Sequence, residues 1–528
     1  MSQGTAPEES VRPASSRALL RASGLIATVT LLTKITGFLR VATIAGRLGA
    51  TPGTDAFLTA FLIPESLYVF LTEGAVTAAF VPPFTRALAG ARGLFGCLLL
   101  WSALAVGLIA SAAAAIVWGF SDTIVSLIAP GFDTTTAKLT AGLTRVVAWY
   151  IPLAAVAAVL FGGLHARGHF LSPALGPLLF NVAVITSAFF AFPGNVSPLA
   201  WGVLAGGLLQ LLVQLPATLV GLPRALARPP EAVPGLAEMG RLLLPLSFSL
   251  GVTQIQILAE RIIASHLPRG VITSLNLVQK LVNLPLGLVG IAVATPLVPA
   301  LARFHLLDDR VGFAVALRRG LVILMGLIAP FTAICLVEPA GVVRLLFQRG
   351  AYGPAEVADA ARMLWLYALS LPAVSGSFLL SGALLATGDA LTPALVRAAL
   401  LTGNIVLNFA WLPWLGSGTI PLCFSLMYLA NVATLLVWMG FRQRLFKTAE
   451  VACRLVAPVG VALVAGYAAS CALGGSTTAH ATPLEALLGI LSVGTASGLS
   501  ALGTTWAVTP RNGLNSAHEN EDQRPIRP

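Results

Sequence analysis

Charged residues are scarce in this chain of 528 residues. Asp, Glu, Lys and Arg make up 10% of it and hydrophobic residues 57%, whereas about 25% of a typical water-soluble domain is charged. A chain with so few charges lacks the polar surface that water requires. This excludes an ordinary soluble protein and indicates a polytopic membrane protein.

Sequence motifs of enzymes and metal sites are also missing. The chain contains no GxxxxGK[ST] phosphate loop, no HExxH and no nucleophile elbow, and its six histidines form no catalytic group. The five cysteines lie far apart without metal-ligand spacing, so we expect them to be small buried hydrophobes. We therefore expect no enzyme, no ATPase site, no cofactor and no metal. Transport energy would come from membrane potential, an ion gradient or substrate supply.

The formal net charge of +11 does not indicate a nucleic-acid partner. The basic residues are scattered between apolar runs and form no patch, so they are read as signals of membrane topology. The first 24 residues are polar and lack the apolar core of a cleavable signal peptide, and residues 511–528 are polar again. Both ends are predicted to be disordered and cytoplasmic.

The apolar runs predict an all-α protein with about fourteen transmembrane helices, because about 20 apolar residues span the hydrocarbon core. The predicted ranges are 25–47, 56–83, 94–119, 139–160, 172–192, 199–221, 241–265, 273–302, 316–337, 361–386, 392–412, 417–440, 451–473 and 484–508. With both termini inside, the inner segments hold 20 Lys and Arg and the outer loops 6. The positive-inside rule favours this orientation.

Several charged residues lie deep within these predicted spans. They are Lys34, Arg40, Glu65, Glu73, Glu260, Arg261 and Lys280. Each costs roughly 3 kcal/mol when it faces lipid, so seven would cost on the order of 20 kcal/mol. The sequence therefore predicts that they face a hydrated cavity or one another.

The deep charges fall on the first two predicted helices of each block of six, which a two-lobed transporter places at its central cleft. Lys34, Gly37 and Arg40 are spaced at i, i+3 and i+6, which we interpret as a slanted row on one helix face, with Gly37 leaving room for a helix or a ligand. Pro64 and Pro285 are expected to interrupt their helices and bend them around the cavity.

Four cations against three carboxylates suit an anionic substrate, and phosphate is the natural candidate for Lys and Arg. The alternative is that the charges are internal ion pairs that fix helix packing. For Glu260 and Arg261, which are adjacent in the chain, both readings stay open.

A long stretch of sequence resembles a known family. The segment TKITGFLRVATIAGRLGATPGTDAFLTAFLIPESLYVFLTEGAVTAAFVPPF, followed by GGLLQLLVQLP, LPLGLVGIAVATPLVPAL, LLFQRGAY and GDALTP, is similar in order to the MurJ (MviN) family of lipid II flippases. The resemblance implies two six-helix lobes around a central cavity, here 25–223 and 224–441, plus two C-terminal helices in 442–510. It also implies the fold of the multidrug/oligosaccharidyl-lipid/polysaccharide exporter superfamily.

By this resemblance the substrate is lipid II, an undecaprenyl-diphosphate carrying a disaccharide-pentapeptide, which is moved across the bacterial inner membrane by alternating access. Its partners would be lipid II or a related polyprenyl-diphosphate glycolipid, membrane lipids and the cell-wall synthesis and division machinery. The cations would hold the diphosphate and headgroup, while the lipid tail extends between helices into the bilayer.

The family pattern also assigns roles to individual residues. Lys34 and Arg40 stand at its first and second arginines, Lys280 at an arginine of the eighth span, and Asp55 and Glu73 at acidic positions. Substrate binding is thus expected from Lys34, Arg40, Lys280 and Arg261, and gating or cavity roles from Asp55, Glu65, Glu73 and Glu260. The chain departs from the pattern at three positions: Val41 replaces an aspartate, Glu65 an asparagine and Tyr68 an arginine.

Three alternatives differ in substrate or in kind. One is a flippase for another polyprenyl-diphosphate-linked saccharide, such as an O-antigen precursor. Another is a drug/cation antiporter of the same superfamily, and the third is a cell-wall scaffold that does not transport. Rescue of growth after depletion of the host flippase separates them.

Overall fold

The chain is described by a computed structural model, which covers residues 16–70, 79–89, 94–220, 236–442, 448–472 and 483–508. Within these ranges the protein is built from helices and contains no strand. The all-α prediction is therefore confirmed.

The first half of the chain forms a bundle of long helices with short ones at its ends. Its helices are α1 (Ser16–Leu48), α2 (Pro52–Phe70), α3 (Val81–Ala89), α4 (Leu94–Gly119), α5 (Ser121–Ile128), α6 (Thr134–Val147), α7 (Tyr150–Ala166), α8 (Leu171–Ala188), α9 (Ser197–Leu212) and α10 (Leu215–Leu219). Together they form the N-terminal lobe.

The second half of the chain forms the C-terminal lobe and ends with a helix pair. Its helices are α11 (Leu236–Ser265), α12 (Val271–Leu306), α13 (Arg310–Val337), α14 (Pro339–Phe347), α15 (Pro354–Ala368), α16 (Ser370–Ala386), α17 (Leu391–Leu415) and α18 (Thr419–Arg442), followed by α19 (Thr448–Ala472) and α20 (Pro483–Val508). A single 3-10 turn, Gly416–Gly418, joins α17 to α18.

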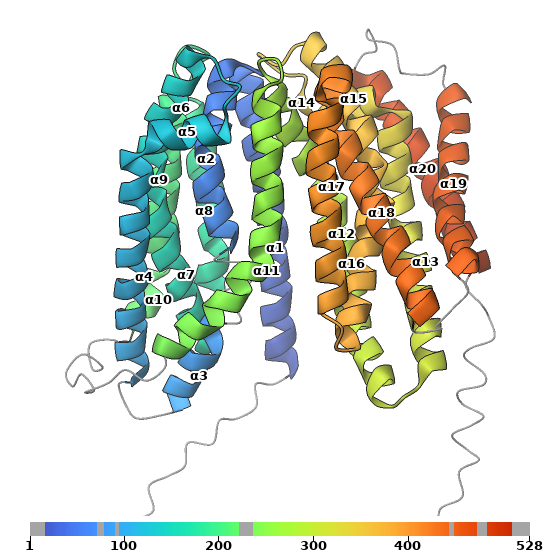
Figure 1. Cartoon of the computed structure of the whole chain (residues 1–528), viewed down its shortest axis with the longest axis horizontal. Helices are drawn as coiled ribbons and strands as arrows, with labels where there is room; N and C mark the ends of the chain where they lie inside the picture. Colours follow the sequence, from blue (N-terminus) through green and yellow to red (C-terminus); the bar gives the residue numbers. More distant parts are fainter. Residues whose placement is uncertain are drawn as a thin grey trace, which may run out of the picture.

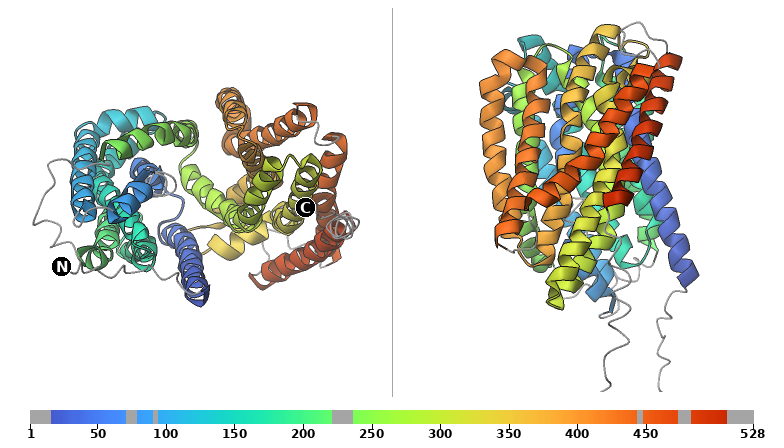
Figure 2. Two further views of the ribbon diagram at one scale, coloured as in Figure 1. Left: turned by 90° about the horizontal axis from the view of Figure 1, so that it is seen from below. Right: turned by 90° about the vertical axis from the view of Figure 1, so that its right-hand side faces the viewer.

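The two lobes stand side by side, with α1 and α11 between them (Figure 1). Seen from below, the helices form two groups, and α19 and α20 lie at the far edge of the second (Figure 2). Helix α1 begins at the lower end and α20 ends toward the same end (Figure 1). We call the opposite end, where α1 ends and α2 begins, the outer end, because the charge-based topology places these residues outside.

Each of the fourteen predicted ranges contains helix in the described part of the chain. Nine helical stretches there are long and apolar enough to cross a membrane, and the longest, Leu391–Gly440, covers two predicted spans. The described parts of α2, α11 and α12 are not among these stretches, and these helices carry Glu65, Glu260, Arg261 and Lys280. Lys34 and Arg40 lie on α1, which is among them, so the charges of the expected cleft lie on helices of both kinds.

Proline does not interrupt α2 or α12, so that part of the sequence prediction is wrong. Pro64 lies inside α2, and Pro285, Pro296 and Pro299 lie inside the 36-residue α12. Each proline removes one backbone donor. In an apolar environment the neighbouring backbone groups find no better partner than the helix, which therefore continues.

Local signals set several helix ends. Asp133 caps α6 by accepting a 2.8 Å hydrogen bond from the Thr136 N–H, and Asp309 caps α13 through the Gly312 N–H at 2.7 Å. Gly270 precedes α12 with a φ of 87°, a left-handed conformation that favours glycine.

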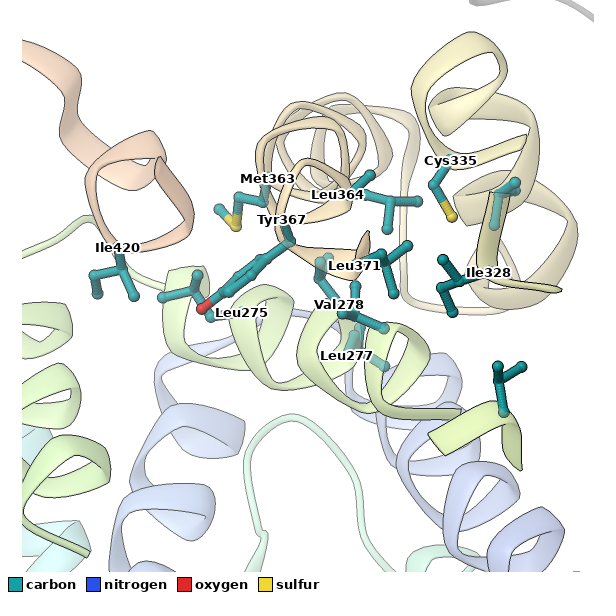
Figure 3. Close-up of a cluster of buried hydrophobic side chains, with 14 of the residues drawn as sticks. Leu275, Leu277, Val278, Ile328, Cys335, Met363, Leu364, Tyr367, Leu371 and Ile420 are labelled. Atoms are coloured by element: carbon teal, nitrogen blue, oxygen red, sulfur yellow. The ribbon is translucent and has the colours of Figure 1, made fainter. Parts of the chain in front are cut away.

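The largest apolar core fills the C-terminal lobe. Tyr367 reaches from α15 across the α12 residues Leu275 and Val278, and Leu364 and Leu371 pack beside it (Figure 3). Such packing holds α12 against the rest of its lobe, so the polar side chains on its other face have a fixed support. Among the described cysteines, Cys97, Cys335 and Cys423 are buried as predicted, whereas Cys471 is exposed.

Candidate functional site

A three-membered ion cluster joins the two lobes. Glu65 Oε1 on α2 lies 3.4 Å from Arg40 Nη2 on α1 and 3.3 Å from Lys280 Nζ on α12. The same carboxylate oxygen therefore bridges a cation from each lobe. The prediction that the deep charges face one another is confirmed for these three residues.

Aromatic rings fix the position of the Arg40 guanidinium. It lies 5.7 Å from the ring centre of Phe61 on α2 and 5.5 Å from that of Phe180 on α8. The ring faces attract a cation and exclude water from one side of it. With a side chain only 12% exposed, Arg40 is the most enclosed member of the cluster.

The cavity beside this cluster is small. Arg40, Glu65 and Lys280 line it together with Thr54, Thr273 and Asn276, and it holds about 20 Å³. That is room for about one water molecule. The large hydrated chamber expected from the sequence is therefore absent at this point in the conformation described.

Lys34 does not join the cluster, which corrects the interpretation of a single cationic row. Six residues of α-helix turn about 600°, so Lys34 and Arg40 lie about 120° apart around α1 and about 9 Å apart along it. Lys34 lines a separate cavity of about 730 Å³ whose walls are almost entirely apolar. They come from α1, α12, α13, α14, α16 and α20, and include Leu281, Pro285, Phe331 and Ile490.

Glu260 and Arg261 lie on α11, next to the ion cluster but not in it. The two Glu260 oxygens accept hydrogen bonds from Gln256 and Gln279, each at 3.0 Å, and Gln279 also bonds to the Tyr367 hydroxyl at 2.9 Å. Glu260 and Arg261 both line a cavity of about 30 Å³. Asn276 lines both this cavity and that of the ion cluster, so the two cavities are neighbours.

Asp55 lies at the outer end, where it caps a helix of the opposite lobe. Its carboxylate accepts hydrogen bonds from the Gly270 N–H at 2.5 Å, the Thr273 N–H at 2.8 Å and the Thr273 hydroxyl at 2.6 Å. The side chain is buried. An acidic group at a helix N-terminus satisfies free N–H donors and interacts favourably with the helix dipole. Asp55 thus holds α2 to the start of α12.

Further contacts between the lobes close the same end. The Ala351 N–H donates to the Gly46 carbonyl at 2.8 Å, the Gly131 N–H donates to Ser265 Oγ at 3.0 Å, and Arg269 pairs with Asp133 at 3.0 Å. Gly270 approaches Ala50 so closely that an added Cβ would lie 2.3 Å from its carbonyl oxygen. Backbone contacts therefore make up much of the outer seam.

The other positions that the sequence singled out are Gly37, Val41, Tyr68 and Glu73. Gly37 faces α8, where an added Cβ would lie 3.5 Å from Asn181 Nδ2, an ordinary contact distance. Val41 is buried, and Tyr68 packs near Tyr150 with ring centres 6.2 Å apart. Glu73 lies outside the described residues. No group of side chains suited to a metal ion occurs in the ranges that the structure describes.

Sequence reasoning missed the residues that hold these charges in place. Phe61 and Phe180 beside Arg40, Gln279 beside Glu260 and Thr273 beside Asp55 belong to other helices than their partners. Gly270 and Thr273 stand at the start of a predicted helix, but their spacing is not that of a capping box. No spacing along the chain indicates that Asp55, 218 residues earlier, supplies the acceptor.

Comparisons with known proteins agree on one family. A family model described as "Lipid II flippase MurJ" matches residues 44–488. The chain is similar to "Lipid II flippase MurJ" of Burkholderia cenocepacia, with 31% identity over 452 residues, which cover 81% of this chain and 84% of that protein.

Solved structures agree on the fold. The structure titled "Lipid II flippase MurJ, inward closed conformation" has a TM-score of 0.74 at 20% identity and covers 90% of this chain and 98% of its own. An inward-facing multidrug resistance MATE transporter of the MOP superfamily has a TM-score of 0.67 at 12% identity, with coverages of 81% and 98%. At these identities the two matches concern the fold alone.

Proposed function

The chain belongs to the lipid II flippase MurJ family, and from this premise we propose that it moves lipid II from the inner to the outer leaflet of the bacterial inner membrane by alternating access. We further propose that both termini are cytoplasmic. The chain acts as a transporter and has no ATPase site of its own.

The observation that carries this proposal is the meeting of Arg40 and Lys280 at one point between the lobes. Two fixed cations from different lobes suit the two phosphates of a diphosphate, because each phosphate attracts a cation by charge-assisted hydrogen bonds. A substrate held from both sides draws the lobes together around itself. Arg40, Lys280 and the neighbouring Arg261 are therefore assigned to the diphosphate and headgroup.

The 730 Å³ apolar cavity suits the lipid tail of such a substrate. Its walls come from α1 and α12, the two helices that also supply Arg40 and Lys280, and from the added helix α20. Apolar walls favour a polyprenyl chain by removing it from water. Lys34 on the wall of this cavity is about 9 Å along α1 from Arg40, a separation that an extended diphosphate headgroup spans.

The small central cavity fits a closed stage of the transport cycle. A diphosphate headgroup does not enter about 20 Å³, so substrate binding requires the lobes to move apart. The outer seam at Asp55 and Gly270 would stay closed while the inner end opens, and would release in the second half of the cycle. Membrane potential, an ion gradient or substrate supply would drive the cycle.

The departures at Glu65 and Tyr68 favour one second candidate. They make the site less positive than the family pattern, which suits a related polyprenyl-diphosphate saccharide with a less acidic headgroup. A contribution of this chain to the cell-wall synthesis and division machinery is part of the same proposal, through the supply of precursor.

Complementation tests the proposed function. We deplete the host flippase, express this chain, and measure growth together with lipid II in the outer leaflet. Wild type should restore both, and Arg40→Ala should restore neither although it inserts into the membrane in normal amount. Normal growth with Arg40→Ala would contradict the diphosphate role, and lipid analysis of the outer leaflet identifies the saccharide that is moved.

A further inference from the structure

Glu65 is unusual because it neutralises the cations that the substrate needs. By the resemblance described above it stands where the family pattern has asparagine, and one of its oxygens contacts both Arg40 and Lys280. All three side chains are half-buried or nearly buried, with exposed fractions of 29% for Glu65, 12% for Arg40 and 38% for Lys280. The contacts are therefore less screened than those of a surface ion pair.

The geometry leaves no space for a second anion beside Glu65. The cavity between the cations holds about 20 Å³, so a phosphate and the carboxylate cannot share Arg40 and Lys280 in this conformation. Two anions on the same cations would also repel each other at close range. For a diphosphate to hold both cations as close together as they are here, Glu65 therefore has to leave them.

We propose that Glu65 is a built-in counter-anion, a specificity-determining residue that occupies the phosphate site when substrate is absent and that the diphosphate displaces. The inference rests on the proposed function. In the empty protein the carboxylate satisfies both cations and connects the lobes. A diphosphate carries roughly one negative charge on each phosphate, so it neutralises the pair better than a single carboxylate does.

The same exchange explains how the substrate leaves. A site with two unopposed cations holds a diphosphate tightly and releases it slowly, because dissociation then exposes both charges. Glu65 offers these cations another partner within the protein, which lowers the cost of release. With Glu65 present, we expect the protein to bind a diphosphate more weakly and to release it faster. Glu65 also excludes anions that carry too little charge to displace it.

Neighbouring groups do not replace Glu65 in this role. Arg261 on α11 interacts with Glu65 electrostatically, but it lines the neighbouring cavity and also interacts with Asp55 and Glu260. Tyr150 on α7 packs its ring against that of Phe180, with ring centres 5.2 Å apart, and supplies no carboxylate. Among the described residues, Glu65 is the carboxylate within 4 Å of both cations.

Binding of a purified polyprenyl-diphosphate sugar to the protein in nanodiscs of zwitterionic lipid tests this role. The variants are Glu65→Gln and Glu65→Asn, the second of which restores the residue of the family pattern. The matched control is Glu238→Gln, which removes the carboxylate of another inter-lobe ion pair, with Arg86 at 2.5 Å, away from the cations. Thermal unfolding establishes that each variant is folded.

Both Glu65 variants should bind at least about tenfold more tightly than wild type, because the ion pairs of Glu65 with Arg40 and Lys280 no longer have to break. The dissociation rate should fall, while Glu238→Gln should match wild type. Folded Glu65 variants that bind equally or more weakly would overturn the counter-anion role, since Glu65 would then support the cations. If neither wild type nor the variants bind, the proposed function itself fails; wild-type binding without a gain in the variants rejects the counter-anion alone.

Discussion

Removing the Asp55 carboxylate should open the outer end of the protein. Asp55 is buried, and it accepts two hydrogen bonds from backbone donors of α12 and one from the Thr273 hydroxyl. A hydrogen bond to a charged group contributes about 1.5–3 kcal/mol, and loss of a helix cap costs about 0.5–2 kcal/mol. These contributions overlap, so for Asp55→Ala we expect a loss of about 2–4 kcal/mol from the closed outer end.

This free energy corresponds to a shift of about 30- to 700-fold in the ratio of closed to open outer ends. Asp55→Asn keeps the shape but loses the charge, and its single amide oxygen replaces part of the hydrogen bonding, so its effect should be smaller. The order of opening should therefore be Asp55→Ala, then Asp55→Asn, then wild type.

Distances between spin labels at positions 138 and 268 measure this opening. Both residues, Lys138 and Pro268, are exposed and belong to opposite lobes. The native cysteines are first replaced, because Cys471 is exposed and would also be labelled. The matched control is Asp133→Asn, which removes an exposed carboxylate that also joins the lobes, and it should change the distances little. Unchanged distances in a folded Asp55→Ala would refute the assignment of Asp55 as a contact that holds the outer end closed.

Two further predictions follow from the outer seam. Gly270→Ala should open the outer end as Asp55→Ala does, because a φ of 87° is strained for alanine and the new Cβ would lie 2.3 Å from the Ala50 carbonyl oxygen. The control is Gly37→Ala, whose Cβ would meet only ordinary contact distances and which should behave as wild type in the same label measurement. A closed outer end in Gly270→Ala would contradict the role of this close contact. The hydrogen bond from the Thr136 N–H holds the pKa of the Asp133 carboxyl below its usual range. The ionised carboxylate therefore stabilises the folded protein at a pH above the pKa that Asp133 has in the unfolded chain. This stabilisation is lost as the pH falls through the pKa of Asp133 in the folded protein. The difference in thermal stability between wild type and Asp133→Asn should therefore shrink on acidification, and a difference independent of pH would show that the carboxylate charge is not involved.

The membrane architecture was predictable because long apolar runs report helices directly. The position of the central site was also predictable: charges as costly as those of Arg40, Glu65 and Lys280 must meet a partner in the bilayer, and the structure joins them. The spacing of Lys34 and Arg40 wrongly predicted that both lie on one face of the helix, because residues six positions apart point to different sides of an α-helix. The apolar cavity next to it is formed by six helices, and no local pattern describes such a wall.

Contacts between distant parts of the chain limited the prediction of the other site residues. Only the family pattern assigned a gating role to Asp55, whereas its function as a helix cap depends on Gly270 and Thr273 of the other lobe. The continuous helix through Pro285 also escaped prediction, since proline disfavours a helix locally while the lipid environment leaves the backbone no alternative.

The added helices α19 and α20 pack against each other and against α13, which is part of the C-terminal lobe. Ile490 of α20 contributes to the wall of the large apolar cavity, and α1 supplies the facing wall. Most of the wall of that cavity therefore belongs to helices of the second lobe, whereas α1 belongs to the first. In the proposed cycle, separation of the lobes would widen this cavity between α1 and the second lobe and would give a long hydrocarbon chain a lateral path into the bilayer.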